Sequence, residues 1–280
     1  MKLPRAAGVT LLEVLISMSL GLVLVLAVAT LHARILFISA ETTRTADAQD
    51  TLRIGFAILE YELRHAGYWG LVPDASWIEG RQGDVEPLEA SVAGDCGAGW
   101  AIDLDRILEA WGAGWPLACG PFGGAPPNGG GLVLRRVDTR LSSPDTGLLQ
   151  VQADPWGGRL TVAGEAADPG AEVRDLVARA YYVSPRSTGD PLRPSLRRKT
   201  LQRGPRVVDE EVLPGIAELG IELGIDTDPE DTPGHGQANR FVPPGMEAGR
   251  VLAVRITLSA DDPSRMRATR TIVLRNGPAS

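Results

Sequence analysis

Cysteine and histidine are scarce in this chain of 280 residues, which contains two cysteines and three histidines. A structural zinc site needs four Cys or His ligands at short spacings. The histidines, His32, His65 and His235, are far apart and form no i, i+4 pair. Cys96 and Cys119 have no histidine close to them in the sequence. The composition therefore disfavours a zinc centre.

Basic residues are also outnumbered, with 28 Lys and Arg against 35 Asp and Glu, a net charge of −7. Nucleic-acid binding needs a basic face, so it is disfavoured. No G-x-S-x-G motif occurs, and the spacing of Ser, His and Asp suggests no triad. The run GGAPPNGGG (123–131) lacks the Lys-Ser/Thr pair of a phosphate loop, so we expect a flexible loop there. The chain is not expected to be an enzyme or to carry a cofactor.

A long apolar run at the N-terminus contrasts with these absences. Residues 9–31 are apolar or small apart from a few hydroxyls and Glu13, a length that spans a bilayer as a helix. Lys2 and Arg5 precede it, and the positive-inside rule keeps residues 1–8 in the cytoplasm and the rest outside. A secretory signal peptide is the simplest alternative, but its apolar core is shorter.

The residues Gly8-Val9-Thr10-Leu11-Leu12-Glu13 before this helix resemble the leader of type IV prepilins. That resemblance implies cleavage by a prepilin peptidase between Gly8 and Val9, and N-methylation of Val9, which stands where Phe is most common. It also implies that Glu13 is an assembly-docking residue, neutralising the terminal amine of a neighbouring subunit. A buried carboxylate tolerates lipid best when it is paired with a cation. Alternatively, Glu13 reaches the lipid headgroups or is protonated.

The helix is expected to continue from the membrane into a folded domain. Residues 33–66 contain no proline, and Leu52, Phe56, Leu59 and Leu63 form an apolar stripe at helical spacing. Gly67 is the predicted stop.

The next segment, LRHAGYWG (63–70), resembles the PilW-type group of minor pilins. Because the prepilin-like leader places the following chain in the oxidising periplasm, we predict a disulfide between Cys96 and Cys119.

Beyond residue 131 the hydrophobic period changes to two, as in Leu219–Ile225 and Leu252–Leu258. The predicted class is α+β and type IV pilin-like, with the long helix packed on an antiparallel β-sheet. Seven further segments are predicted as strands: 132–137, 148–152, 159–162, 176–183, 195–201, 207–213 and 269–275. The predicted divisions are a leader (1–8), a transmembrane helix (9–32), its amphipathic continuation (33–66), an irregular Trp/Gly-rich insert (67–131) and the sheet domain (132–280).

An acidic loop follows one of these strands. Asp226, Asp228, Glu230 and Asp231 are weak candidates for calcium binding, because alternating carboxylates can converge on this ion. Their spacing departs from an EF-hand loop, and a solvated acidic turn is the alternative.

The PilW-type resemblance implies a minor pilin that primes assembly or sits at the pilus tip. Its implied partners are other minor pilins, the major pilin, the prepilin peptidase and the inner-membrane assembly platform. It would wait in the inner membrane with its C-terminal domain in the periplasm before it joins the fibre. Two alternatives are a J-like pseudopilin of type II secretion and a pilus-tip adhesin that binds a surface ligand through the Trp-rich insert or the acidic loop.

Overall fold

The computed structural model describes residues 10–262 and 264–276. The chain divides into two compact units, residues 1–47 and 48–280. Gly8 and Val9, the predicted cleavage and methylation residues, lie outside the described residues.

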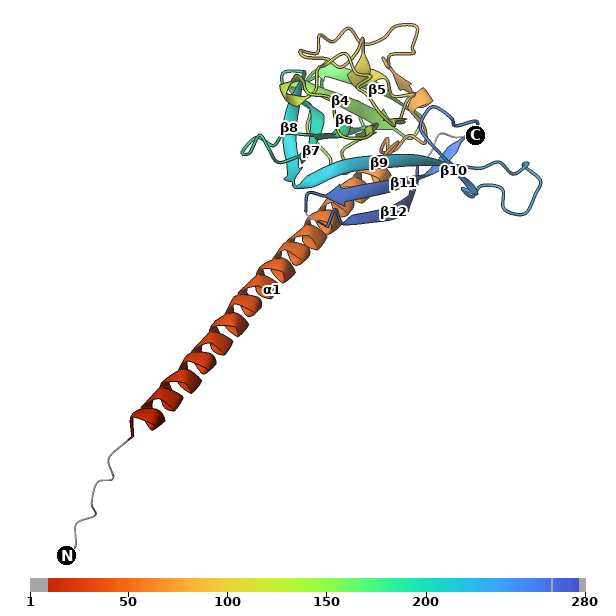
Figure 1. Ribbon diagram of the computed structural model, residues 1–280. Helices are drawn as coiled ribbons and strands as arrows, with labels where there is room; N and C mark the ends of the chain where they lie inside the picture. Colours follow the sequence, from red (N-terminus) through yellow and green to blue (C-terminus); the bar gives the residue numbers. More distant parts are fainter. Residues whose placement is uncertain (1–9, 263, 277–280) are drawn as a thin grey trace, which may run out of the picture. The chain divides into compact units, whose positions relative to one another are not determined.

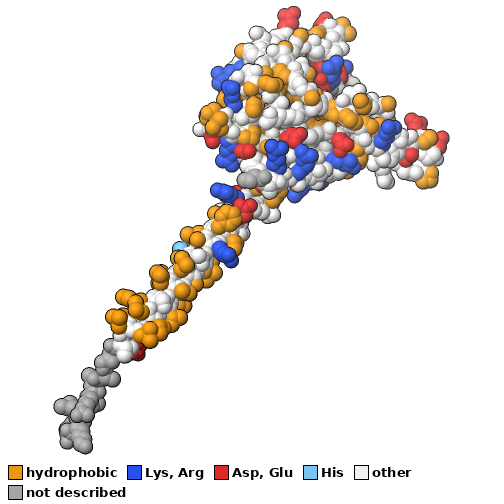
Figure 2. Space-filling view, viewed as in Figure 1, with side chains coloured by type: hydrophobic (Ala, Val, Ile, Leu, Met, Phe, Trp, Pro, Cys, Tyr) orange, Lys and Arg blue, Asp and Glu red, His pale blue; other side chains and the backbone are white. Residues whose placement is uncertain are grey.

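Helix α1 is the main helical element and runs from Leu11 to His65 (Figure 1). Its first part is covered by hydrophobic side chains (Figure 2) and is long and apolar enough to cross a bilayer. The hydroxyls of Ser17, Ser19 and Thr30 donate to helix carbonyls three or four residues earlier, at 2.7 to 2.9 Å. These bonds let polar side chains lie in an apolar helix without unpaired donors.

The helix stops where the sequence predicts. Arg64 and His65 occupy the last turn, where the helix dipole favours positive charge. Gly67 follows with φ of 73°, a left-handed conformation that favours glycine. A Cβ on Gly67 would approach the Asn276 carbonyl oxygen to 2.3 Å, so close packing also requires glycine here. Of the helix predicted over residues 9–66, Leu11–His65 is confirmed.

The second unit contains two β-sheets. The order in the larger sheet is β1-β5-β4-β6-β3-β2; in addition, β7 pairs with β6, and β8 pairs with β7. The order in the smaller sheet is β10-β9-β11-β12. Every pair is antiparallel except β1 with β5. The strands are β1 (Ile78–Glu79), β2 (Leu108–Trp111), β3 (Gly131–Val137), β4 (Thr146–Asp154), β5 (Gly157–Ala163), β6 (Glu172–Ser184), β7 (Ser195–Gln202), β8 (Arg206–Pro214), β9 (Ile216–Ile225), β10 (Arg240–Val242), β11 (Val251–Ala260) and β12 (Arg267–Val273). Short 3₁₀ helices lie at Ala75–Trp77, Trp100–Ile102 and Phe122–Gly124.

The α+β class is confirmed, and each of the nine predicted strand segments overlaps a strand. The expectation of one sheet is wrong, because the strands form two. Gly215 separates β8 from β9 with φ of 88°, so the chain turns out of the larger sheet there. The strands β1, β2 and β10 were not predicted, since two to four residues are too few to show a period.

Two hydrophobic clusters hold the second unit together. In the first, the buried stripe Leu52, Phe56, Leu59 and Leu63 packs against residues of β9 and β11, and of β3, β6 and β7. Gly55 lets the helix come close, since a Cβ there would lie 3.0 Å from Leu258 Cδ1. The second cluster contains the buried residues of the segment 67–131, including β1 and the tryptophans Trp69, Trp100 and Trp111. They pack with residues of β4 and β5 and with those residues of β3 and β6 that face away from the first cluster. The Trp-rich insert is therefore part of the domain core.

Candidate functional site

Glu13 lies in the first turn of α1, at the end of the predicted leader motif. Thr10 precedes the helix and accepts a hydrogen bond from the Glu13 amide through its carbonyl oxygen at 3.1 Å and through Oγ1 at 3.3 Å. This is the N-cap arrangement of a Thr followed three residues later by Glu. The Glu13 carboxylate is exposed and has no partner within the described residues. It is thus available to a cation from another molecule.

The part of α1 in the second unit has an apolar outer face. Ile54, Ala57, Ile58 and Tyr61 lie together around a shallow hollow flanked by Arg53 and Glu62. Ile54 and Tyr61 are both nearly half exposed. This face points away from the buried stripe, so it is a candidate contact surface for neighbouring helices.

Glu62 is a buried carboxylate on α1 that the local sequence pattern does not reveal. Its exposed fraction is 3%. It pairs with Arg136 of β3, whose Nε lies 3.4 Å from Oε2, and with Arg179 of β6, which donates to Oε1. Arg136 also lies over the Tyr61 ring at 5.6 Å. Because a buried charge is tolerated only when paired, this cluster fixes the helix at one position on the sheet.

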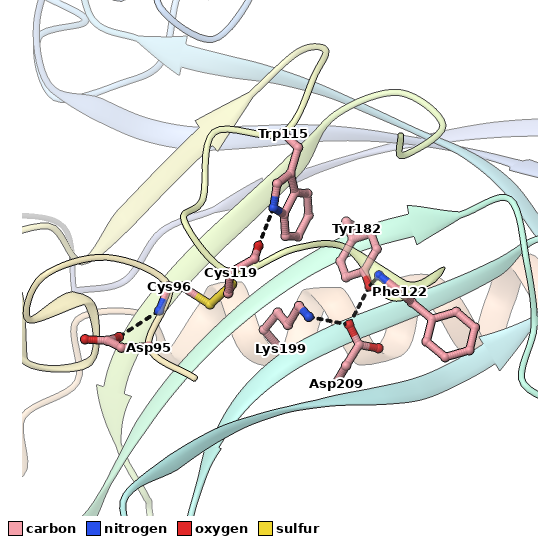
Figure 3. The surroundings of a disulfide bond; sticks show 8 residues. All are labelled: Asp95, Cys96, Trp115, Cys119, Phe122, Tyr182, Lys199 and Asp209. Atoms are coloured by element: carbon pink, nitrogen blue, oxygen red, sulfur yellow. Dashed lines mark hydrogen bonds and ion pairs between the residues drawn. A yellow bond between two sulfur atoms is a disulfide. The ribbon is translucent and has the colours of Figure 1, made fainter. Parts of the chain in front are cut away.

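Cys96 and Cys119 form a disulfide, with an S–S distance of 1.98 Å (Figure 3). The Trp115 Nε1 donates to the Cys119 carbonyl oxygen at 2.5 Å. After the disulfide, the Phe122 amide donates to the Tyr182 hydroxyl at 2.9 Å, and that hydroxyl donates to Asp209 at 2.5 Å. The disulfide and these bonds fasten the insert to β6 and β8.

Burial and hydrogen bonding shift the pKa of two residues near the insert, Tyr182 and Glu211. Burial, together with the hydrogen bond to Asp209, raises the pKa of Tyr182 well above its usual value, so the phenol stays a donor. On β8, burial works against ionisation of Glu211, but the Thr188 amide and further hydrogen bonds hold the pKa of Glu211 below its usual value. Arg197, which is almost fully buried, pairs with both Asp209 and Glu211 at 2.6 and 3.2 Å.

The acidic loop between β9 and β10 uses its first carboxylate internally. Asp226 accepts from the amides of Asp228 and Gly236 at 2.9 and 2.5 Å, and these bonds lower the pKa of Asp226. His235 Nδ1 lies 3.2 Å from the same carboxylate. In the described part of the chain, no three His, Cys, Asp or Glu side chains are arranged to hold a metal ion. Asp226, Asp228, Glu230 and Asp231 are therefore not brought together as ligands.

The glycine-rich run 123–131 is not the flexible loop expected from its composition. Asn128 N donates to the Val183 carbonyl oxygen at 2.9 Å, and Asn128 Nδ2 donates to that of Ala217 at 3.1 Å. Gly130 N donates to the Leu219 carbonyl oxygen at 2.8 Å. Val183 belongs to the larger sheet and Leu219 to the smaller one, so this loop joins the two sheets.

Comparison with known proteins adds one finding. Residues 3–29 match the family described as the prokaryotic N-terminal methylation motif. Searches of curated proteins and of solved structures gave no significant match. The motif, followed by an apolar helix and a mostly β domain, supports a type IV pilin-like protein, a prepilin of a pilus or pseudopilus.

Proposed function

We propose that this chain is a minor pilin of the PilW type, a structural subunit that primes a type IV pilus or occupies its tip. The observation that carries the proposal is the methylation motif over residues 3–29, which from Leu11 onward forms the start of α1. In this role the prepilin peptidase cuts between Gly8 and Val9 and methylates Val9. The chain then waits in the inner membrane with its second unit in the periplasm.

Assembly rests on Glu13 and on the apolar face of α1. The free amine of a neighbouring processed subunit would pair with the unpartnered Glu13 carboxylate, which makes its position in lipid tolerable. Ile54, Ala57, Ile58 and Tyr61 would pack against helices of other minor pilins and the major pilin. The inner-membrane assembly platform would bring these subunits together.

Intact-mass measurement of the chain, expressed with and without a prepilin peptidase, tests the proposal. We expect the peptidase to remove residues 1–8 and add one methyl group to Val9. An unprocessed chain in the presence of an active peptidase would contradict a pilin role.

The nearest alternative is a J-like pseudopilin of type II secretion, which shares the motif and the helix. Deletion of the gene separates the two roles. Lost pilus assembly or twitching with normal secretion supports the minor pilin, and the reverse supports the pseudopilin. An adhesin role, the third possibility, requires a ligand site on the second unit.

A further inference from the structure

The tip of the β4–β5 hairpin exposes a tryptophan beside a polar pocket. Trp156 is 85% exposed, and its side chain makes no hydrogen bond or ring contact with any described residue. It lines a pocket of about 390 Å³ together with Glu79, Gln152, Asp154, Arg159 and Asp168, the turn glycines Gly157 and Gly158, and Ala171. The pocket is open to solvent, so a ligand would lie against it with one side exposed.

The pairing of three strands builds the floor of this pocket. Glu79 of β1 lies opposite Arg159 of β5, and Arg159 lies opposite Gln152 of β4. Asp154 lies two residues beyond Gln152, on the same face of β4. A row of polar groups therefore crosses three strands and ends beside the tryptophan.

Hydrogen bonds in the hairpin fix the backbone at Trp156 and do not involve its ring. Asp154 Oδ1 accepts from the amides of Trp156 and Gly157 at 2.7 and 3.0 Å, which fixes the turn. A rigid turn that presents a large exposed ring loses little conformational entropy on binding. One exposed tryptophan alone would mean little, but this ring lies beside unused polar atoms.

Several polar atoms in the pocket are available to a ligand. Glu79 has no partner among the described residues, and Asp154 uses only one of its oxygens. The Nε of Arg159 also lacks a hydrogen-bond acceptor in the described structure, but it is buried, so a ligand reaches it only if the side chain moves. Arg159 Nη2 donates to Gln152 Oε1 at 3.2 Å and lies 3.6 Å from the Asp168 carboxylate and 3.7 Å from that of Glu165.

We propose that this pocket, defined by Trp156, Glu79, Asp154 and Arg159, binds a neutral carbohydrate. A pyranose ring has an apolar face of C–H groups that stacks on an indole, and vicinal hydroxyls at its edge that donate to carboxylates. Three carboxylates against one arginine disfavour an anionic glycan. The excess of carboxylates would also attract a cation, but only one aromatic ring lines the pocket, whereas recognition of organic cations by aromatic side chains uses a cage of several.

The site is separate from the assembly surface. None of the residues that line the pocket lines the hollow on α1. In Figure 1, β4 and β5 lie at the upper side of the domain and β11 and β12 at its lower side. Carbohydrate binding therefore does not depend on the proposed minor-pilin role and can be tested without pilus assembly.

The test is binding of neutral hexasaccharides (cellohexaose, chitohexaose, mannohexaose and maltohexaose) to the purified full chain in a sugar-free detergent, measured by calorimetry. We expect at least one to bind, Trp156→Ala to weaken that binding at least tenfold, and Trp156→Tyr to retain part of it. Glu79→Gln should weaken it several-fold. Leu192→Ala, which removes an apolar side chain that is 90% exposed outside the pocket, is the matched control and should bind normally.

Polygalacturonate and polylysine serve as the anionic and cationic probes. The proposal is overturned if none of the four hexasaccharides binds, or if their binding is unchanged in Trp156→Ala. It is also overturned if only polylysine or only polygalacturonate binds in a Trp156-dependent way. Far-UV circular dichroism of each variant confirms that the fold is intact, as expected for side chains that make no hydrogen bond, ion pair or ring contact with the described residues.

Discussion

Replacing Glu62 with leucine should strongly destabilise the second unit. The substitution keeps a side chain of similar size but removes the carboxylate that Arg136 and Arg179 share. Arg136 has a side-chain exposure of 3%, so its charge would remain buried without its carboxylate partner. Breaking a buried pair from one side costs about 3–5 kcal/mol.

Urea unfolding followed by tryptophan fluorescence measures this loss. All six tryptophans lie in residues 48–280, so the signal reports the second unit and not the apolar start of α1. With a urea dependence of about 2 kcal/mol per M, the midpoint should fall by roughly 2 M. Adding Arg136→Met to Glu62→Leu should recover part of the loss, because the unpaired charge is then removed as well.

Glu60→Gln is the matched control on the same helix. Glu60 pairs with Arg64 at 2.7 Å and Arg270 at 3.4 Å, but its side chain is 31% exposed. Exposed pairs contribute about 0–1 kcal/mol, so the midpoint should move little. Equal losses in Glu60→Gln and Glu62→Leu would refute the argument that burial gives the Glu62 pair its importance.

Three further predictions concern other parts of the chain. Glu13→Ala should leave the second unit folded but reduce incorporation into fibres, and normal incorporation in quantitative immunoblots of sheared pili would contradict this. Replacing both Cys96 and Cys119 with serine should lower the unfolding free energy by about 3 kcal/mol, and addition of a reductant should then have no further effect on the urea midpoint. Because the pKa of Glu211 is depressed in the fold, its contribution to stability is present above the ordinary glutamate pKa of 4.5 and is lost as pH falls through the lower folded value; Glu211→Gln should make acid unfolding less steep.

The periodic elements were predictable from the sequence because each pattern is local. Leu52, Phe56, Leu59 and Leu63 repeat at helical spacing, and all four are buried. Alternation similarly predicted β9 and β11. The helix end was predictable from Gly67, whose positive φ few other residues adopt.

The unforeseen features depend on pairs distant in the sequence. Glu62 and Arg136 are 74 residues apart, and nothing in the residues near Glu62 reveals its partner. A polar residue beside the apolar stripe and two adjacent arginines in an apolar segment were the available signals. The acidic loop shows the converse, because its carboxylates are close in sequence but do not converge in space.

The Trp156 pocket has the same origin, since it exists only through strand pairing. Glu79 lies opposite Arg159 in the parallel strand pair β1–β5, and β1 has only two residues. The disulfide and the buried tryptophans of the insert belong to the core cluster that includes Ile78 of β1. The insert therefore does more than cover one side of the sheet, because it places Glu79 at the pocket.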